Sequence, residues 1–405
     1  MGKVVDFGGG DGRFALFGQF DEYVGYEIDP RLCSAAELPV NSRIANQCAF
    51  SAPLDNADLC IGNPPFVRNQ DLPTGWRDRA SKVIFKRLGV TVSGLANAWQ
   101  YFFFLALATA KPDGVCALVV PYEWVSRPSS KAVRTYIERS GWDVAVYRLV
   151  DATFRSVLTT ASITVIDKAS KSGSWSYFEE SSTGAYRPLS SPSGSADGVI
   201  PYMDRATALK ASSFAKRGLS PGTQQVLTLT EGERVRQALR IGVDVVPCVT
   251  TLRDLPTGCT RLDDPTFRRY YRDLGRKCWL VRTHPQPSRR LIRYLDAVPV
   301  EARQTSTCLE RVDWWRFAMP DVACLLVSMT FRTTFPKFVR NDVNAIAVGG
   351  VYGIYGLSED ELSAAMTQFM GLDIRDRVVA HSHGLRKIEI GQLNNLLGEL
   401  LESRT

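Results

Sequence analysis

Short apolar runs, each followed by a polar or glycine-rich turn, dominate the first part of the sequence and predict buried strands. These expected strands are 3–7, 23–27, 43–50, 57–61, 115–120, 144–150 and 162–167. Helices are expected between them, over 15–20, 80–88, 96–111 and 131–139. Strands that alternate with helices are typical of an α/β domain. The apolar, aromatic helix at 96–111 is expected to lie in its core.

A glycine-rich turn follows the first expected strand and precedes a helix. It contains Gly8, Gly10 and Gly12 within the sequence Gly8-Gly9-Gly10-Asp11-Gly12. Glycines allow a ligand to approach the backbone, and an amide-rich turn before a helix suits a phosphate or nucleotide. Glu27 ends the second strand, about 20 residues after the first, where an acid can bind ribose hydroxyls. The glycine-rich turn and Glu27 together predict a nucleoside-binding site.

The fourth expected strand ends in Ile61-Gly62-Asn63-Pro64-Pro65-Phe66. Two prolines restrict the backbone, so Asn63 should present its amide on a rigid turn with a ring three residues later. Such a turn could hold a planar, amide-like nitrogen; an ordinary strand-ending turn is the alternative. Ligands of α/β sheets bind at the carboxyl ends of the strands. The glycine turn, Glu27 and Asn63 all fall there.

The second half of the chain is basic, although the first half is neutral. Residues 1–200 hold 20 Lys and Arg against 20 Asp and Glu, and residues 201–405 hold 29 against 22. Ten basic residues lie within 261–293, interleaved with aromatic residues. A solvated surface is one explanation, and a polyanion such as nucleic acid is the other. A Ser/Gly-rich stretch at 168–198 predicts a loop or linker, and helices are expected at 359–370 and 390–401.

Other classes of protein are disfavoured by composition. No apolar run approaches the ~20 residues that cross a membrane, and we expect no signal peptide. The nine cysteines form no CxxC pair, and with three histidines no zinc spacing is present. We therefore expect no metal site, reduced thiols and a cytoplasmic location. No second centre resembling a nuclease is visible.

These motifs resemble those of S-adenosylmethionine-dependent amino-methyltransferases of DNA in the gamma order, and most closely the Taq-type adenine-N6 enzymes of restriction–modification systems. The similarity is carried by Asp6–Phe14, Glu27–Pro30 and Asn63–Phe66, followed by Gly114–Trp124 and Phe154–Asp167. It is specific over residues 4–168 and loose afterwards, where Gly384–Leu397 resembles the end of a recognition domain.

The resemblance implies a Rossmann-like methyltransferase sheet followed by a mixed α+β DNA target-recognition domain. The expected division is a catalytic domain at 1–168, a connecting segment at 169–224 and a basic recognition domain at 225–405. The implied cofactor is S-adenosyl-L-methionine, and the implied partner is double-stranded DNA from which the target adenine is flipped.

The resemblance also assigns residues. The cofactor would be bound by Asp6, Phe7, Gly8, Gly10, Gly12, Glu27, Ile28 and Phe50. Asn63, Pro64, Pro65 and Phe66 would form the catalytic turn, with Phe154 stacking on the other face of the base; a plain core role is the alternative for Phe154. The basic residues expected to contact DNA are Arg68, Lys86, Arg268, Arg269, Arg272 and Arg276. For the segment that holds Arg68 and Lys86, a solvated lid or helix face is the alternative.

Two departures from the family pattern lead to alternatives. Gamma-order enzymes usually carry a helix and turn before the first strand, whereas this sequence begins just before it. The alternatives are that the segment is missing, that this family member does without it, or that a partner chain supplies it. The acid expected against the cofactor's adenine is replaced by Ala49, next to Phe50. One alternative is therefore a DNA-binding protein with a degenerate or partner-dependent methyltransferase domain. Another is a protein glutamine-N methyltransferase, against which the basic second half argues.

Overall fold

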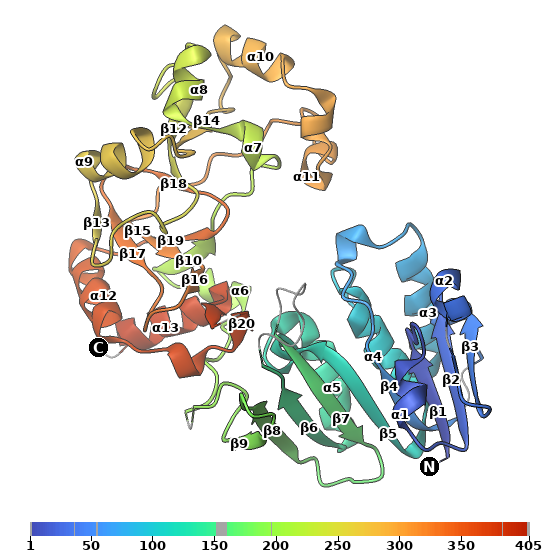
Figure 1. Ribbon diagram of the computed structural model, residues 1–405. Helices are drawn as coiled ribbons and strands as arrows, with labels where there is room; N and C mark the ends of the chain where they lie inside the picture. The colour runs from blue at the N-terminus through green and yellow to red at the C-terminus, as the bar shows by residue number, and fades with distance from the viewer. Residues whose placement is uncertain are drawn as a thin grey trace. The chain divides into compact units, whose positions relative to one another are not determined.

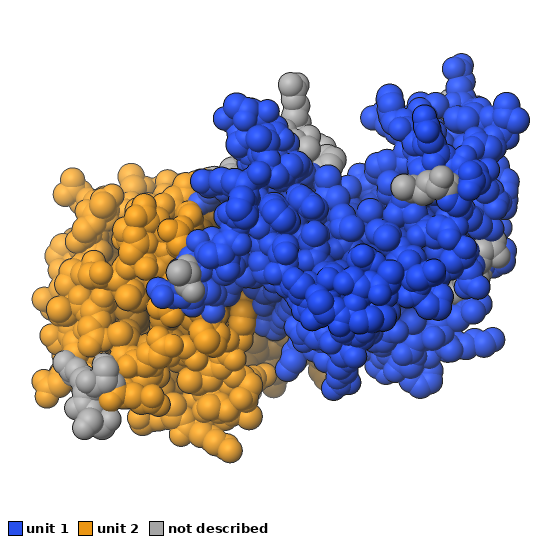
Figure 2. Space-filling model, turned by 90° about the horizontal axis from the view of Figure 1, so that it is seen from below, with its two compact units in different colours: residues 1–199, 379–384 blue, residues 200–378, 385–405 orange. Residues whose placement is uncertain are grey.

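A computed structural model describes residues 2–35, 37–53, 56–150, 160–195, 197–382 and 384–402 (Figure 1). The chain divides into two units, which Figure 2 colours separately. Unit 1 comprises residues 1–199 and 379–384, and unit 2 comprises residues 200–378 and 385–405.

Unit 1 is built on a nine-stranded mixed sheet with the order β3-β2-β1-β4-β5-β7-β6-β8-β9. Strands β1 to β5 are parallel, and β7 is antiparallel to both of its neighbours, β5 and β6. The strands are β1 (Lys3–Phe7), β2 (Glu22–Glu27), β3 (Ser42–Asn46), β4 (Ala57–Gly62), β5 (Ala110–Pro121), β6 (Asp143–Arg148), β7 (Ala161–Asp167), β8 (Trp175–Glu180) and β9 (Tyr186–Leu189). The short strand β20 (Ala380–Ser382) also belongs to this unit.

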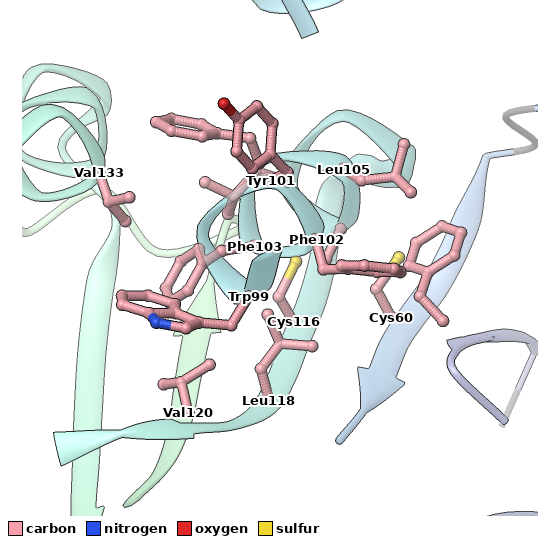
Figure 3. Packing of buried hydrophobic residues seen from close by; sticks show 14 of the residues in the cluster. Cys60, Trp99, Tyr101, Phe102, Phe103, Leu105, Cys116, Leu118, Val120 and Val133 are labelled. Carbon is pink, nitrogen blue, oxygen red and sulfur yellow. The ribbon is translucent and has the colours of Figure 1, made fainter. Parts of the chain in front are cut away.

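The helices of unit 1 are α1 (Arg13–Phe17), α2 (Pro30–Ala35), α3 (Trp76–Leu88), α4 (Ala98–Thr109) and α5 (Lys131–Ser140). Helix α4 is buried almost all round, as its predominantly apolar sequence predicts. Figure 3 shows Trp99 and Phe103 of this helix beside Leu118 and Val120 of β5, in the main core of the unit. The expectation that the aromatic residues of 96–111 form core is confirmed.

The sheet has a topological switch point between β1 and β4. From β1 the chain continues to β2 and β3 on one side, and β4 and β5 lie on the other. In the parallel pair β1–β4, Val5 lies opposite Cys60 and Asp6 opposite Ile61. The turns that follow the two strands therefore leave the same edge of the sheet, which is where open α/β sheets bind their ligands.

Unit 2 contains shorter strands in a five-stranded sheet, β10-β19-β15-β17-β13, and a four-stranded sheet, β11-β14-β12-β18, with β16 paired to β21. Their bounds are β10 (Phe214–Arg217), β11 (Thr228–Leu229), β12 (Val245–Val249), β13 (Arg261–Leu262), β14 (Trp279–Val281), β15 (Leu325–Ser328), β16 (Thr330–Phe331), β17 (Phe338–Asn341), β18 (Ile346–Ala347), β19 (Val351–Tyr355) and β21 (Leu385–Lys387). Two apolar cores support these sheets.

Two helices of unit 2 begin at capping boxes. Thr230 with Glu233 and Ser358 with Glu361 form capping boxes at α8 and α12. The helices are α6 (Arg205–Ala208), α7 (Gln224–Leu227), α8 (Glu231–Arg236), α9 (Asp264–Phe267), α10 (Arg289–Asp296), α11 (Ser306–Leu309), α12 (Glu359–Gly371) and α13 (Ile390–Glu402). A π-helical turn, η5 (Arg268–Arg272), continues α9.

The fold class expected from the sequence, α/β followed by mixed α+β, is confirmed. Strands β8 and β9 lie within the segment 169–224 that the sequence indicates as a connection, and they extend the sheet of unit 1. All nine cysteines are free thiols. No helix in the described part of the chain is long and apolar enough to cross a membrane.

Candidate functional site

The glycine turn after β1 adopts a backbone that only glycine accepts easily. Gly8, Gly10 and Gly12 have φ values of 88°, 54° and 79°. The amides of Gly8 and Gly9 both donate to the carbonyl oxygen of Tyr26 at the end of β2, at 2.9 and 3.1 Å. Apart from its two chain neighbours, no described residue has an atom within 4 Å of the position that a Cβ on Gly10 would take, so its backbone is open to a ligand.

The Glu27 side chain at the end of β2 holds this turn in place. Its Oε2 accepts a hydrogen bond from the Gly10 amide at 3.0 Å, and its Oε1 accepts from the Ile28 and Asp29 amides at 2.8 and 2.9 Å. Sequence reasoning assigned this residue to ribose binding and missed the link to Gly10. The pairing joins residues 17 positions apart, so local sequence carries no signal for it.

The Asn63–Phe66 turn begins where β4 ends and lies directly beside the glycine turn. A Cβ placed on Gly8 would be 3.7 Å from the Asn63 carbonyl oxygen and 3.9 Å from Pro65 Cδ. The Asn63 residue is exposed, Pro64 is buried, and Phe66 is half-buried against the main core of unit 1. The rigid turn therefore presents Asn63 at the switch point.

Gly62 is a site residue that sequence reasoning missed. A Cβ at this position would lie 3.1 Å from the Phe7 carbonyl oxygen and 3.2 Å from Asp6 Oδ1. These contacts are tighter than almost all real Cβ contacts, so the close approach of β4 to β1 requires glycine. The signal available in the sequence is a glycine at the end of an otherwise apolar strand.

Asp6 is fully buried beneath the two turns. Its Oδ2 accepts a hydrogen bond from the Tyr23 hydroxyl at 2.5 Å, whereas its Oδ1 has no hydrogen-bond partner among the described residues. Burial raises the pKa of Asp6 to about 7; the Tyr23 hydrogen bond lowers this pKa and the charge of Glu27 raises it. The carboxyl thus lies against the glycine turn, with Oδ2 3.7 Å from the position that a Cβ on Gly9 would take.

The segment after Phe66 is bound to the start of α4. The Ala98 amide donates to the Val67 carbonyl oxygen at 2.9 Å, and the Asn69 amide donates to Asn97 Oδ1 at 3.1 Å. Of the two basic residues expected to contact DNA here, Arg68 forms an ion pair with Asp71 at 2.9 Å. The other, Lys86, lies exposed in the last turn of α3.

The apolar residues expected at the cofactor differ in exposure. Ile28 is 72% exposed and free to pack on a ligand, whereas Phe7 is buried and stacks on Tyr26. Phe50 is 8% exposed and packs edge-on against Trp76 and Phe102. Phe154 lies outside the described residues.

The basic residues expected in unit 2 lie around η5. Arg268 pairs with Asp264 at 3.4 Å, and Arg272 pairs with Glu231 at 3.3 Å. The other two are Arg276, which pairs with Asp254 at 3.2 Å, and Arg269, which is exposed and has its guanidinium 5.3 Å from the ring centre of Tyr270. No group of three or more His, Cys, Asp or Glu side chains in the described ranges is arranged to hold a metal ion.

Comparisons with known proteins agree with these motifs. Residues 46–153, which include the Asn63 turn and α4, match the Eco57I restriction-modification methylase family. Type II methyltransferase M.XamI of Xanthomonas campestris pv. amaranthicola is 23% identical over 388 residues, which cover 87% of this chain and 71% of that protein. The resemblance to restriction–modification DNA methyltransferases is confirmed.

Solved structures extend the likeness in fold. The type IIL restriction-modification enzyme MmeI, solved in complex with DNA, aligns over 97% of this chain with a TM-score of 0.66 and 12% identity. The type IIG restriction endonuclease BpuSI aligns over 99% with a TM-score of 0.41 and 11% identity. This chain spans 62% of the MmeI chain and 57% of the BpuSI chain. The MmeI match covers both units and shows a shared fold.

Proposed function

We propose that the protein is an S-adenosylmethionine-dependent DNA methyltransferase of the restriction–modification type that methylates adenine N6 within a specific site. The observation that carries this proposal is the contact between the glycine turn and the catalytic turn, in which the Gly8 Cβ position lies 3.7 Å from the Asn63 carbonyl oxygen. A cofactor on the first turn and a base on the second would meet at the switch point of the sheet.

The residues present fit S-adenosyl-L-methionine. The open backbone at Gly10 and the exposed Ile28 side chain leave room for a nucleoside at the carboxyl end of β2. Three backbone amides occupy the Glu27 carboxylate, and a carboxylate has about four acceptor sites, so one remains for a ribose hydroxyl. When bound, the cofactor supplies a methyl group on a positively charged sulfur.

The Asn63 turn suits the N6 amino group of adenine. This nitrogen is a poor nucleophile because its lone pair is conjugated with the ring. The Asn63 side-chain oxygen and the Pro64 carbonyl oxygen would each accept one N6–H, which favours a tetrahedral nitrogen with a localised lone pair. Neither oxygen is a strong base, so orientation and electrostatic stabilisation would provide the rate enhancement.

The target base would be flipped out of the duplex to reach this turn. Phe66 would stack on one face of the base and Phe154 on the other. Stacking is worth about 1–3 kcal/mol per base, which offsets part of an unstacking cost of a few kcal/mol. Unit 2 would act as the recognition domain, and the DNA-bound MmeI structure, which has the same fold, supports double-stranded DNA as the partner.

A degenerate or partner-dependent methyltransferase domain is the second candidate. It is favoured by Ala49, which follows β3 at the position where the family pattern has an acid for the amino group of the cofactor's adenine. A partner chain that completes the cofactor pocket would then be needed for turnover. Calorimetry separates the two candidates, because an autonomous enzyme should bind S-adenosylmethionine saturably by itself.

The test is incubation with labelled S-adenosylmethionine and mixed double-stranded DNA, followed by identification of the modified base. Label on adenine N6, lost by at least ~100-fold in Asn63→Ala, is expected because the variant removes a positioned acceptor. Asn56→Ala is the control, since Asn56 is exposed at the opposite end of β4. Label on cytosine or on protein glutamine, or near-normal turnover of Asn63→Ala, would contradict the proposal.

A further inference from the structure

The basic cluster of residues 261–293 separates into two groups in the structure. Arginine and lysine side chains of its first part form ion pairs with carboxylates, namely Arg261 with Asp342, Arg268 with Asp264, Arg272 with Glu231, Arg276 with Asp254 and Lys277 with Glu233. In the second part, Arg282, Arg289, Arg290 and Arg293 form no ion pair with any carboxylate of the described residues. In the first part, Arg269 also forms no ion pair within the described residues, and its guanidinium lies over the Tyr270 ring, so unpaired positive charge is concentrated in the second part.

Helix α10 holds three of these arginines on one face. Leu291 and Leu295 are fully buried, and Ser288 caps the helix by accepting from the Leu291 amide at 3.2 Å. At 100° per residue, Arg289, Arg290 and Arg293 fall on the side opposite the two leucines, and all three are exposed. The helix is also fastened by the Tyr294 hydroxyl, which donates to the Val226 carbonyl oxygen at 2.7 Å.

The fourth arginine, Arg282, contacts the same loop as Arg290 of this face, which is the loop 238–244. Arg290 Nη1 donates to the Ala238 carbonyl oxygen at 3.2 Å, and Arg282 Nη1 donates to the Gly242 carbonyl oxygen at 2.5 Å. Each guanidinium has five N–H groups, so most of its donors remain available. Figure 1 shows α10 beside α8, the helix that precedes this loop. We call Arg282, Arg289, Arg290 and Arg293 the α10 arginine face.

Two acids lie near the α10 arginine face. Asp244, in the loop, is buried, and its Oδ2 accepts from the backbone amide and Nε of Arg240 at 2.8 and 3.2 Å. This pairing neutralises Arg240 and leaves the four arginines unaffected. Asp296 is exposed at the end of α10 and forms no ion pair among the described residues, so the face keeps a clear positive excess.

We propose that the α10 arginine face binds the phosphate backbone of double-stranded DNA. The inference rests on the proposed function for the identity of the polyanion. Arginines on a rigid helix, without carboxylate partners, match phosphates spaced along a duplex, and such contacts set the position of a protein without reading sequence. The ion-paired arginines around η5 would have to break their pairs before they could make the same contacts.

The test measures DNA affinity against salt for the triple variant Arg289→Ala, Arg290→Ala and Arg293→Ala, with fluorescence anisotropy on duplexes of different sequence. Each phosphate contact contributes about 0.9 to the slope of log K against log salt, so the slope should fall by about 2–3. Affinity at 100 mM salt should fall at least ~10-fold for every sequence. Lysine at the three positions should restore most of the slope, because it keeps the charge.

The control is the triple variant Arg261→Ala, Arg316→Ala and Arg375→Ala, which removes three exposed but ion-paired charges of the same unit. Its slope should fall by less than ~1. An unchanged slope in the α10 variant, or an equal fall in the control, would overturn the inference. If the unmodified protein bound no DNA, the proposed function would fail instead, and urea unfolding of each variant excludes loss of fold as the cause.

Discussion

The Glu27 carboxylate accepts a hydrogen bond from the Gly10 amide, with 3.0 Å between Oε2 and the nitrogen. This bond connects the end of β2 to the turn after β1. The acid therefore shapes the glycine turn, and under the proposed function it would also bind a ribose.

Replacing Glu27 by alanine should weaken S-adenosylmethionine binding about 10- to 100-fold. The substitution removes three charge-assisted hydrogen bonds to backbone amides, each worth about 1.5–3 kcal/mol, although water would replace part of that. Glu27→Gln keeps one acceptor oxygen and should lose less. Isothermal titration calorimetry of the three proteins measures the effect.

Glu22→Ala is the matched control, because Glu22 lies at the start of β2 and forms ion pairs with Lys3 and Arg43 on the surface. It should leave cofactor affinity within about twofold. An unchanged dissociation constant in Glu27→Ala would show that the acid does not organise the turn.

Burial of Asp6 gives the stability of the protein a distinctive pH dependence. Its pKa is raised to about 7 in the folded state, against about 4 when unfolded, so the folded state binds more protons between these values. The contribution of Asp6 to the free energy of unfolding therefore falls as pH rises from about 4 to 7 and is constant above. Asp6→Asn should become progressively more stable than the wild type over this range.

Urea unfolding at pH 5, 6, 7 and 8 measures this difference. Asp58→Asn provides the comparison, since hydrogen bonding to Lys111 lowers the pKa of Asp58 and keeps it ionised over the same range. Its difference from the wild type should not change with pH. A flat difference for Asp6→Asn as well would mean that Asp6 is ionised in the folded state throughout.

Features that depend on neighbouring residues could be predicted from the sequence. The glycine turn, the proline-fixed Asn63 turn and the strands before them follow from apolar runs and backbone restrictions, and each strand start or end fell within a few residues of the observed one. An exception is the strand expected at 115–120, which is observed as β5 from Ala110 to Pro121. The strand starts earlier because Ala110 pairs with Ala57 of β4, and after a register shift the pairing resumes between Val115 and Leu59.

Features that depend on distant pairing could not be predicted. Arg272 and Glu231 are 41 residues apart, and nothing in the local pattern indicates that this arginine is paired whereas Arg293 is not. The same holds for β8, which joins the sheet of unit 1 by pairing with β6. The α10 arginine face could therefore not be predicted from the sequence, because it depends on which arginines form ion pairs with distant residues.

Lys168 should be important for the stability of unit 1. It is only 6% exposed, and its Nζ donates to the carbonyl oxygens of Leu107 and Ala110 at 3.1 and 2.6 Å, at the end of α4. Burial lowers the pKa of Lys168. Lys168→Met keeps the length but leaves two carbonyls without this donor, and should reduce the free energy of unfolding by about 2–4 kcal/mol.

Urea denaturation measures the loss, and Lys171→Met is the control. Lys171 is exposed, yet its ammonium lies 5.3 Å from the ring centre of Trp142, close to the 5.1 Å of Lys168. The control should cost less than about 1 kcal/mol. Equal losses would assign the stabilisation to the shared ring contact and not to the carbonyls of α4.

The pairing of β1 with β4 limits which insertions the candidate site could tolerate. Backbone pairing between the neighbouring strands β1 and β4 fixes the distance between the Gly8 and Asn63 turns. Gly62, which has no side chain, lies where the two strands approach each other, and no loop separates the strands from their turns. Insertion of one residue in either strand would turn its side chains to the other face of the sheet. The gap between the two turns is therefore established when the sheet forms.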